Sequence, residues 1–216
     1  MTRQARRQQM TDRVGLVFVI SGPSGSGKGT VVDILREIYD EIGVSVSATS
    51  RSPRPGEADG VNYYYKTREE FESLIKNGEV LEYTQYNSNY YGTLKSEADK
   101  ITASGKDLIL EIEIDGGGQV KRLLGDKCIN IMLIAPDAAE LERRLRDRGT
   151  ETEEAILGRL ARAKEEIKEG IKMDYLVVNE TGKSRECAEK LLTIIKAEHM
   201  RAHRAENYLK KNFPEN

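Results

Sequence analysis

The stretch that decides the fold is residues 14–30, VGLVFVISGPSGSGKGT. Its first part, residues 14–20, is almost continuously apolar and rich in β-branched side chains, which predicts a strand of a parallel sheet buried on both faces. The strand stops at Ser21-Gly22-Pro23, and a helical pattern follows and continues to Glu41. Its apolar positions are Val31, Ile34, Leu35 and Ile38. A strand, a tight loop and a helix are therefore predicted in this order.

The loop between strand and helix matches the phosphate-loop pattern G-x-x-x-x-G-K, with Gly29 in the place where the strict motif has Ser or Thr. Glycines let the backbone curl so that successive N–H groups point at phosphate oxygens, and Lys28 adds positive charge. The helix directs the positive end of its dipole to the same place. A Gly- and Ser-rich turn with a solvated lysine is the alternative, but the flanking strand and helix favour a triphosphate site. Its predicted residues are Gly22, Pro23, Ser24, Gly25, Ser26, Gly27, Lys28, Gly29 and Thr30.

The composition excludes several classes of protein. The 216 residues carry 34 Lys plus Arg against 36 Asp plus Glu, a net charge of -2, so no nucleic-acid partner is predicted. The longest apolar stretch, residues 16–20, is far below the roughly 20 residues that span a membrane, so no membrane partner is predicted either. Cys128 and Cys187 are far apart and outside any C-x-x-C spacing, which favours a reducing compartment and hence the cytoplasm.

Further two-faced apolar runs occur at residues 107–112, 128–135 and 175–178, each next to a helical pattern. This alternation predicts an α/β fold with a parallel central sheet and helices on both faces. Residues 51–92 interrupt it with a Pro- and Gly-rich turn, three tyrosines, a short helix with a Thr67-to-Glu70 capping box, and the strand-like VLEYTQY. We therefore expect a small mixed α+β insert.

A second interruption lies at residues 143–162, where two helical patterns meet at Gly149-Thr150 with almost no apolar residue at the junction. A polar hinge with little to bury is typical of a lid that moves. Residues 1–13 are basic, with four arginines and no apolar core of a signal peptide, so they are predicted to be a mobile tail; a targeting or RNA-binding role is the alternative. His199 and His203 are four apart in the last predicted helix, and a solvated face is favoured over a metal site.

Six segments in this order resemble the guanylate kinase family: GPSGSGKGT, SVSATSRSPRPGE, VLEYTQYNSNYYGT, ILEIEIDG, RRLRDRGTETEEAILGRL and DYLVVNE. The resemblance spans about residues 14–200 and implies a three-layer P-loop kinase fold. It also implies a kinase that transfers the terminal phosphate of ATP to GMP, and to dGMP as well, with Mg²⁺. The domain at 14–216 then divides into a core (14–50, 94–142 and 163–216), a GMP-binding region (51–93) and a lid (143–162). The oligomeric state is left open.

A phosphate clamp is expected at Arg51 and Arg54, which lie three apart in a turn stiffened by two prolines. Two guanidinium groups held in this way can converge on one 5′-monophosphate. The resemblance adds Tyr63 and Tyr91 as donors to the same phosphate. A packed aromatic patch is the preferred interpretation of the remaining tyrosines of this region, Tyr64, Tyr65 and Tyr90.

Glu82 is expected to recognise the guanine base, because a carboxylate only accepts hydrogen bonds and guanine offers adjacent N–H donors at N1 and N2. The resemblance matches Glu82 to the base-reading glutamate of the family and Glu113 to a second acidic position. It also matches Ser47 and Thr93 to hydroxyl positions around the base. Alternation in LEIEI places Glu111 and Glu113 on one face of a buried strand, where a charge requires a partner such as a ligand or a water on Mg²⁺.

The GMP phosphate is already an anion, so catalysis is expected to rest on positioning and charge neutralisation. The resemblance matches three arginines to phosphate-binding lid positions: Arg144, Arg148 and Arg159. Together with Lys28 and Arg51 they are the predicted catalytic residues, whereas Arg143, Arg146 and Arg162 are interpreted as solvated or ion-paired surface charge. Asn179 matches a position near the adenine, and Thr30 is the candidate Mg²⁺ ligand because Gly29 lacks a hydroxyl. Asp115 stands where the family often has an amide.

Two other functions remain to be weighed. The resemblance extends to guanylate-kinase-like scaffolding modules that bind partner proteins without catalysis, but these lack a working phosphate loop. A kinase of similar fold that acts on a phosphorylated sugar would give no reason for Ser47, Glu82 and Thr93 to occur together. The enzyme is therefore favoured over both.

Overall fold

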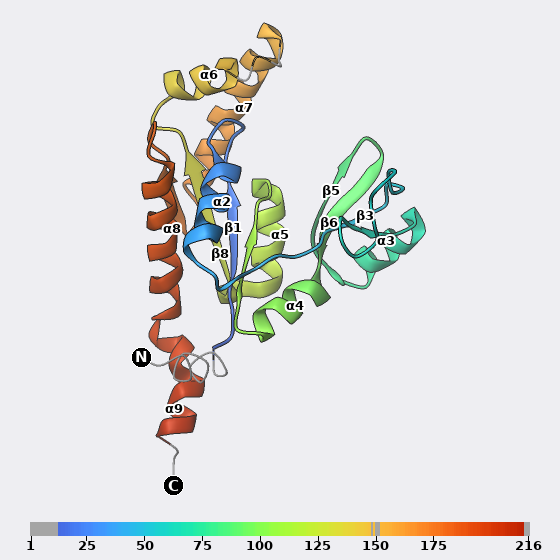
Figure 1. Ribbon diagram of the computed structural model, residues 1–216, viewed down its shortest axis with the longest axis vertical. Helices are drawn as coiled ribbons and strands as arrows, with labels where there is room; N and C mark the ends of the chain where they lie inside the picture. The colour runs from blue at the N-terminus through green and yellow to red at the C-terminus, as the bar shows by residue number, and fades with distance from the viewer. Residues whose placement is uncertain (1–12, 148, 150–151, 214–216) are drawn as a thin grey trace. The chain divides into compact units, whose positions relative to one another are not determined.

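The computed structural model describes residues 13–147, 149 and 152–213 (Figure 1). Contacts between Cα atoms divide the chain into two compact units. The first contains Arg13 with residues 20–41 and 131–213, and the second contains residues 14–19 and 42–130. Each unit is described by itself.

The central sheet has the strand order β2-β7-β1-β8-β9. Its strands are β1 (Val17–Ser21), β2 (Ile42–Gly43), β7 (Asp107–Leu110), β8 (Cys128–Ile134) and β9 (Tyr175–Val178). The pairs β1–β7, β2–β7 and β8–β9 are parallel. The predicted α/β class with a parallel central sheet is confirmed.

The helices of the first unit begin with α2 (Lys28–Ile38), which lies against α8 (Ser184–His199) (Figure 1). The others are α6 (Ala138–Asp147), α7 (Glu153–Gly170), the 3-10 helix η2 (Ala202–Ala205) and α9 (Glu206–Asn212). The prediction that the first helix continues to Glu41 is wrong, because Tyr39 already has an extended backbone with φ of -144°. No helix of the described part of the chain is long and apolar enough to cross a bilayer.

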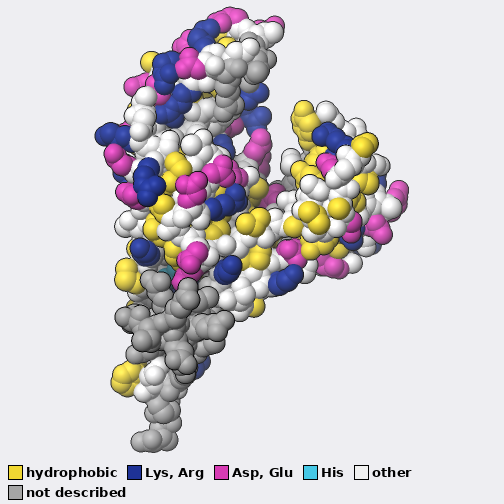
Figure 2. All heavy atoms as spheres, viewed as in Figure 1, with side chains coloured by type: hydrophobic (Ala, Val, Ile, Leu, Met, Phe, Trp, Pro, Cys, Tyr) yellow, Lys and Arg dark blue, Asp and Glu magenta, His cyan; other side chains and the backbone are white. Residues whose placement is uncertain are grey.

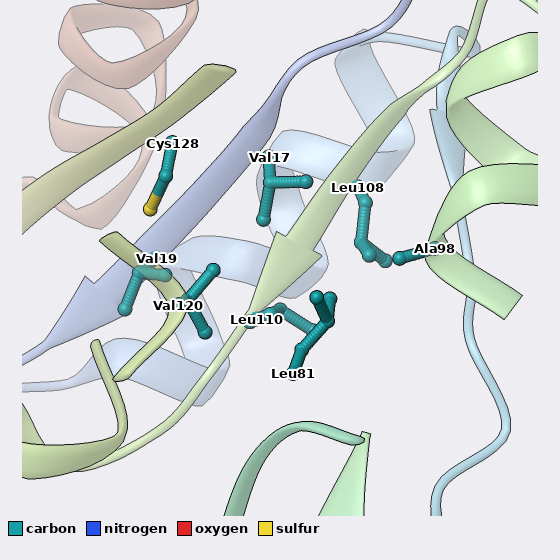
Figure 3. Close-up of a cluster of buried hydrophobic side chains, with 8 residues drawn as sticks. All are labelled: Val17, Val19, Leu81, Ala98, Leu108, Leu110, Val120 and Cys128. Carbon is teal, nitrogen blue, oxygen red and sulfur yellow. The ribbon is translucent and has the colours of Figure 1, made fainter. Parts of the chain in front are cut away.

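The core of the second unit is a cluster of buried side chains (Figure 3). Its members are Val17, Val19, Leu81, Ala98, Leu108, Leu110, Val120 and Cys128, from β1, β5 (Val80–Tyr86), α4 (Lys95–Ala103), β7, α5 (Ile114–Leu124) and β8. The 3-10 helix η1 (Gly125–Lys127) joins α5 to β8. Leu81 is 1% exposed and anchors β5 in this core, next to an irregularity in the pairing of that strand between Val80 and Glu82.

The predicted mixed insert is confirmed as a second sheet, of strand order β4-β3-β6-β5, in the same unit. Its elements are β3 (Ala48–Thr49), β4 (Tyr64–Tyr65), α3 (Arg68–Lys76), β5 (Val80–Tyr86) and β6 (Asn89–Leu94). Both hydrogen bonds of the predicted capping box form, since Thr67 accepts from the Glu70 backbone and Glu70 accepts from the Thr67 backbone. Phe71 of α3 is fully buried and stacks on Tyr90 with ring centroids 5.3 Å apart.

The expectation that Glu111 and Glu113 share one face of a buried strand is wrong. Strand β7 ends at Leu110, Glu111 is exposed, and Glu113 is the exposed N-cap residue of α5. The LEIEI alternation resembles a strand, but the chain has left the sheet at this point. No buried charge therefore has to be neutralised here.

Arg13, the first described residue, is held within the first unit. Arg13 forms a salt bridge with Glu41, donates to the Tyr39 hydroxyl at 2.8 Å and lies 2.8 Å from Nε2 of His199. The last residue of the predicted tail is thus anchored, whereas residues 1–12 lie outside the described residues. Helix α8 ends at His199 and His203 lies in η2, so placing both histidines in one helix was wrong.

Candidate active site

The phosphate loop joins β1 to α2 in the predicted order, and two of its glycines are required by the backbone. At Gly22 a side chain would begin 2.1 Å from the Leu133 carbonyl oxygen. Gly27, the N-cap of α2, has a φ of +89°, in the left-handed region that glycine adopts most readily. The loop therefore reaches the N-terminus of α2 in a conformation that other residues would strain.

Lys28 is the first residue of α2, and its Nζ folds back over the loop to donate to the carbonyl oxygens of Gly22 and, at 3.4 Å, of Pro23. The ammonium group and the positive end of the helix dipole therefore lie at the same loop, which makes a site for an anion such as phosphate. Gly29 and Thr30 are exposed in the first turn of the helix.

Arg144 and Asn179 hold the backbone of this loop at Ser26. The Ser26 carbonyl accepts from Asn179 Nδ2 at 2.9 Å and from Arg144 Nη1 at 3.3 Å. Arg144 Nη2 also donates to the Asn179 carbonyl at 2.9 Å. Asn179 was predicted near the adenine; the structure places its amide group against the loop backbone, and the contact with a base stays a prediction.

Arg159 of α7 also reaches the loop, because its Nη1 donates to the Ser24 hydroxyl at 2.8 Å. Two of the three predicted lid arginines are thus next to the phosphate loop, and the third, Arg148, lies outside the described residues.

The other arginines of this segment are ion-paired, as predicted: Arg143 with Glu140 and Asp147, Arg146 with Glu142 and Glu153, and Arg162 with Glu166. Figure 2 shows the basic and acidic side chains interleaved over α6 and α7. On either side of the junction, Leu141 and Leu145 of α6 form a buried cluster with Ile156 and Ala163 of α7. The predicted polar hinge itself falls mostly outside the described residues.

Arg51, in the second unit, is held by a carboxylate that the sequence analysis did not single out. Its Nη2 donates to both oxygens of Glu57 at 3.0 Å, and its Nη1 donates to the Ser52 carbonyl at 2.7 Å. Glu57 also accepts from the Arg54 backbone N–H at 2.7 Å and from the Tyr65 hydroxyl at 2.8 Å. These donors, the Arg54 N–H above all, lower the pKa of Glu57 to about 2.

The Arg51 guanidinium carbon lies 5.6 Å from the ring centre of Tyr63 and 5.8 Å from that of Tyr65. Tyr91 joins the cluster, with its ring 6.1 Å from that of Tyr63. The structure thus brings Tyr63 and Tyr91 close to Arg51, as the clamp requires. Arg54 bonds Glu57 through its backbone N–H, and its side chain is exposed.

The packed aromatic patch contains Tyr64 and Tyr90, as predicted, since both lie against the cluster around Phe71. Tyr65, the third tyrosine interpreted in this way, packs edge-on against Tyr63 and lies beside Arg51 instead of against Phe71. Strand β4 alternates, so Tyr64 faces one side while Tyr63 and Tyr65, with rings 6.0 Å apart, face the other. This period-2 signal was available in the sequence.

Glu82 is 6% exposed and accepts a 2.8 Å hydrogen bond from the Thr93 hydroxyl on the neighbouring strand β6. Burial raises the pKa of Glu82, because a carboxylate loses hydration when it leaves water. Gly116 in the first turn of α5 is close enough that a side chain there would begin 3.3 Å from Glu82 Oε2. This brings the start of α5, with Glu113 at its N-cap, near the Glu82–Thr93 pair. Ser47 is half-buried beside the same sheet.

A parallel sheet that delivers a phosphate loop with its lysine to the N-terminus of a helix, with arginines at the loop, defines a P-loop nucleotide kinase. A sequence model of guanylate kinase matches residues 15–198. The chain belongs to the guanylate kinase family.

Individual relatives agree with the family model. The chain is 45% identical over 202 residues to a guanylate kinase of Oceanobacillus iheyensis, with 94% of this chain and 97% of that protein covered. It is 47% identical over 190 residues to one of Lactococcus lactis, with 88% and 91% covered. The crystal structure of guanylate kinase from Anaplasma phagocytophilum superimposes with a TM-score of 0.67 at 31% identity, covering 94% of this chain and 98% of that chain.

Proposed function

We infer that the chain transfers the terminal phosphate of ATP to GMP, giving ADP and GDP, and we propose the residues that do so. The observation that carries the choice of GMP is Glu82, a buried carboxylate beside the Thr93 hydroxyl. A carboxylate that only accepts hydrogen bonds matches the N1–H and N2–H donors of guanine and repels the bare N1 acceptor of adenine. Ser47 and Glu113 complete this base site, and dGMP is proposed as a second acceptor.

The ATP phosphates bind to the loop of residues 22–30, with Lys28 on the outer phosphates and Asn179 towards the adenine. The glycine-dependent conformation of this loop and the position of Lys28 at the start of α2 support the assignment of the loop to the ATP phosphates. The GMP phosphate binds to Arg51, Tyr63 and Tyr91, with Arg54 closing on it from the exposed side of the turn.

Mg²⁺ is proposed to enter with ATP. Among the described residues no group of three or more His, Cys, Asp or Glu side chains is placed to hold a metal, so a dedicated protein site is not the arrangement that fits. A hydroxyl does fit, because Mg²⁺ prefers oxygen ligands and keeps several waters on nucleotide phosphates, and Thr30 is exposed two residues after Lys28. When bound, the ion neutralises charge on the transferred phosphoryl group.

In the reaction an oxygen of the GMP phosphate attacks the γ-phosphorus of ATP, and the bond from that phosphorus to the β-phosphate oxygen breaks. Both reactants are anions, so no strong base is needed and their repulsion is the main obstacle. Lys28 and Arg51 offset that repulsion from the two substrates' own sites. Arg144, Arg148 and Arg159 add charge from the lid, which also excludes water when it closes.

The lid, residues 143–162, is expected to close on the phosphates. Hydrogen exchange should slow across residues 152–159 when both nucleotides are bound, because Arg159 then holds phosphate in addition to its contact with Ser24. Helix α8, which lies outside both the GMP-binding region and the lid and carries none of the proposed nucleotide ligands, is the internal reference for general stabilisation. Equal protection of both segments, or none in the lid, would contradict the closure of this segment.

The transfer itself is tested with ATP labelled at the γ-phosphate and unlabelled GMP. We expect the label in GDP, with little inorganic phosphate, because the loop and lid favour GMP over water as acceptor. Label released mainly as inorganic phosphate would mean that the chain is an ATPase, and no release at all would favour the scaffolding alternative.

The substrates are small nucleotides, and the near balance of acidic and basic residues gives no reason for a nucleic-acid partner. A cytoplasmic location is proposed because Cys128 and Cys187 are both buried as thiols, which suits a reducing compartment.

A further inference from the structure

Glu57 and Tyr65 form a layer behind Arg51 that none of the proposed substrate contacts uses. The Glu57 carboxylate receives four hydrogen bonds from three residues: two from Arg51, one from the Arg54 backbone and one from the Tyr65 hydroxyl. A carboxylate with this many donors is fixed in position, and it then fixes the donor that is free to rotate, the Arg51 guanidinium. The Arg51 and Glu57 side chains are 15% and 19% exposed, so the pair is sheltered at the base of the turn.

We propose that Glu57 and Tyr65 are positioning residues that hold the Arg51 guanidinium in place for the phosphate of the acceptor nucleotide. This inference rests on the proposed function and extends it to two residues that do not touch the substrate. Arg51 has five N–H donors: one N–H of Nη2 is shared between the two Glu57 oxygens and one N–H of Nη1 bonds the Ser52 carbonyl, which leaves three for a phosphate. A long arginine side chain otherwise loses much rotational freedom when it binds an anion, and a side chain fixed in advance avoids most of that cost.

The rings around Arg51 support the same role. Tyr63 and Tyr65 both lie within 6 Å of the guanidinium carbon, at 5.6 and 5.8 Å, and cover it as aromatic rings cover cations. Tyr65 therefore acts on Arg51 twice, by its ring directly and by its hydroxyl through Glu57. The burial of Tyr65 and its bond to Glu57 raise the pKa of that hydroxyl, so it stays a donor at neutral pH.

The test compares GMP with guanosine, which has the same base and no phosphate. Calorimetry gives the dissociation constant of guanosine divided by that of GMP. This ratio measures only the contribution of the phosphate site. Glu57→Gln keeps the shape of the side chain but removes its charge, and we expect it to reduce this ratio about tenfold while guanosine binding is unchanged. Tyr65→Phe removes only the hydroxyl and should reduce the ratio less. Tyr64 lies in the same strand as Tyr65, and its hydroxyl bonds to Glu97 of α4. Tyr64→Phe is therefore the matched control and should leave the ratio unchanged.

A double-mutant cycle with Arg51→Ala decides whether Glu57 acts through Arg51. Once the guanidinium is gone, Glu57→Gln should have no further effect on the ratio, and KM for ATP should be unaffected throughout. If the losses in the ratio caused by Glu57→Gln and Arg51→Ala add up in the double variant, the proposal is overturned. Tighter GMP binding by Glu57→Gln would also overturn it, because Glu57 would then compete with the phosphate for Arg51. If the wild-type chain itself binds GMP no better than guanosine, the assignment of Arg51 to the phosphate fails instead.

Discussion

Replacing Lys28 with alanine is expected to lower the turnover of ATP and GMP about 10³-fold while the protein stays folded. Its Nζ lies over the phosphate loop, bonded to the Gly22 and Pro23 carbonyls, where the outer phosphates of ATP bind in our proposal. The loss corresponds to about 4 kcal/mol of transition-state stabilisation. Steady-state kinetics with a coupled ADP assay measures it, and kcat should fall more than KM for GMP rises.

Lys168→Ala is the matched control for this substitution. Lys168 belongs to the same unit and pairs with Glu165 on the exposed face of α7, so its removal should change neither turnover nor the circular dichroism spectrum. Normal activity of Lys28→Ala would refute the phosphate-loop assignment. Loss of its folded spectrum would leave the assignment to be decided by Lys28→Arg, which keeps the charge but not the shape and should remain impaired.

Glu82→Gln is expected to reverse part of the preference for GMP over AMP. A glutamine side chain carries one donor and one acceptor, which no longer matches the paired donors of guanine but does match N1 and the exocyclic amine of adenine. We expect kcat/KM for GMP to fall about 10²-fold to 10³-fold, a loss of about 3 to 4 kcal/mol, and the value for AMP to rise.

The charge state of Glu82 adds a pH test. Burial raises the pKa of this carboxyl above 4.5, and the protonated form would present a donor to the donors of guanine. The test uses guanosine, because the phosphate of GMP itself titrates near pH ~6. Guanosine affinity should be at its maximum above the raised pKa of Glu82 and fall as the pH drops through it, whereas Glu82→Gln should show no such fall. Glu79→Gln, an exposed carboxylate immediately before β5, is the control for both experiments. A wild-type affinity that is constant down to pH 4 would contradict a direct contact between Glu82 and the base.

The parts of the fold that the sequence predicted correctly are those fixed by local pattern. The phosphate loop is one, because a buried strand, closely spaced glycines and an amphipathic helix within one short stretch leave few alternatives. The capping box at Thr67 and the ion-paired arginines Arg143 and Arg146 are others, since each depends on neighbours within one or two helical turns.

The errors arose where distant residues decide. Nothing in LEIEI shows that β7 ends at Leu110, because the departure from the sheet depends on α5 packing closely over β1; a side chain at Gly117 would begin 3.1 Å from Val19. Glu57 was overlooked because its role depends on a turn that brings Arg51, Arg54 and Tyr65 to one carboxylate. Tyr65, in contrast, could have been placed by simple strand alternation.

The central claim is that a P-loop kinase selects guanine through one buried carboxylate. It is tested most directly by measuring ADP release from ATP with GMP, dGMP, AMP, CMP and UMP in turn, with the wild-type chain. We expect strong turnover with GMP, turnover with dGMP, and very little with AMP. Equal rates with GMP and AMP would contradict it.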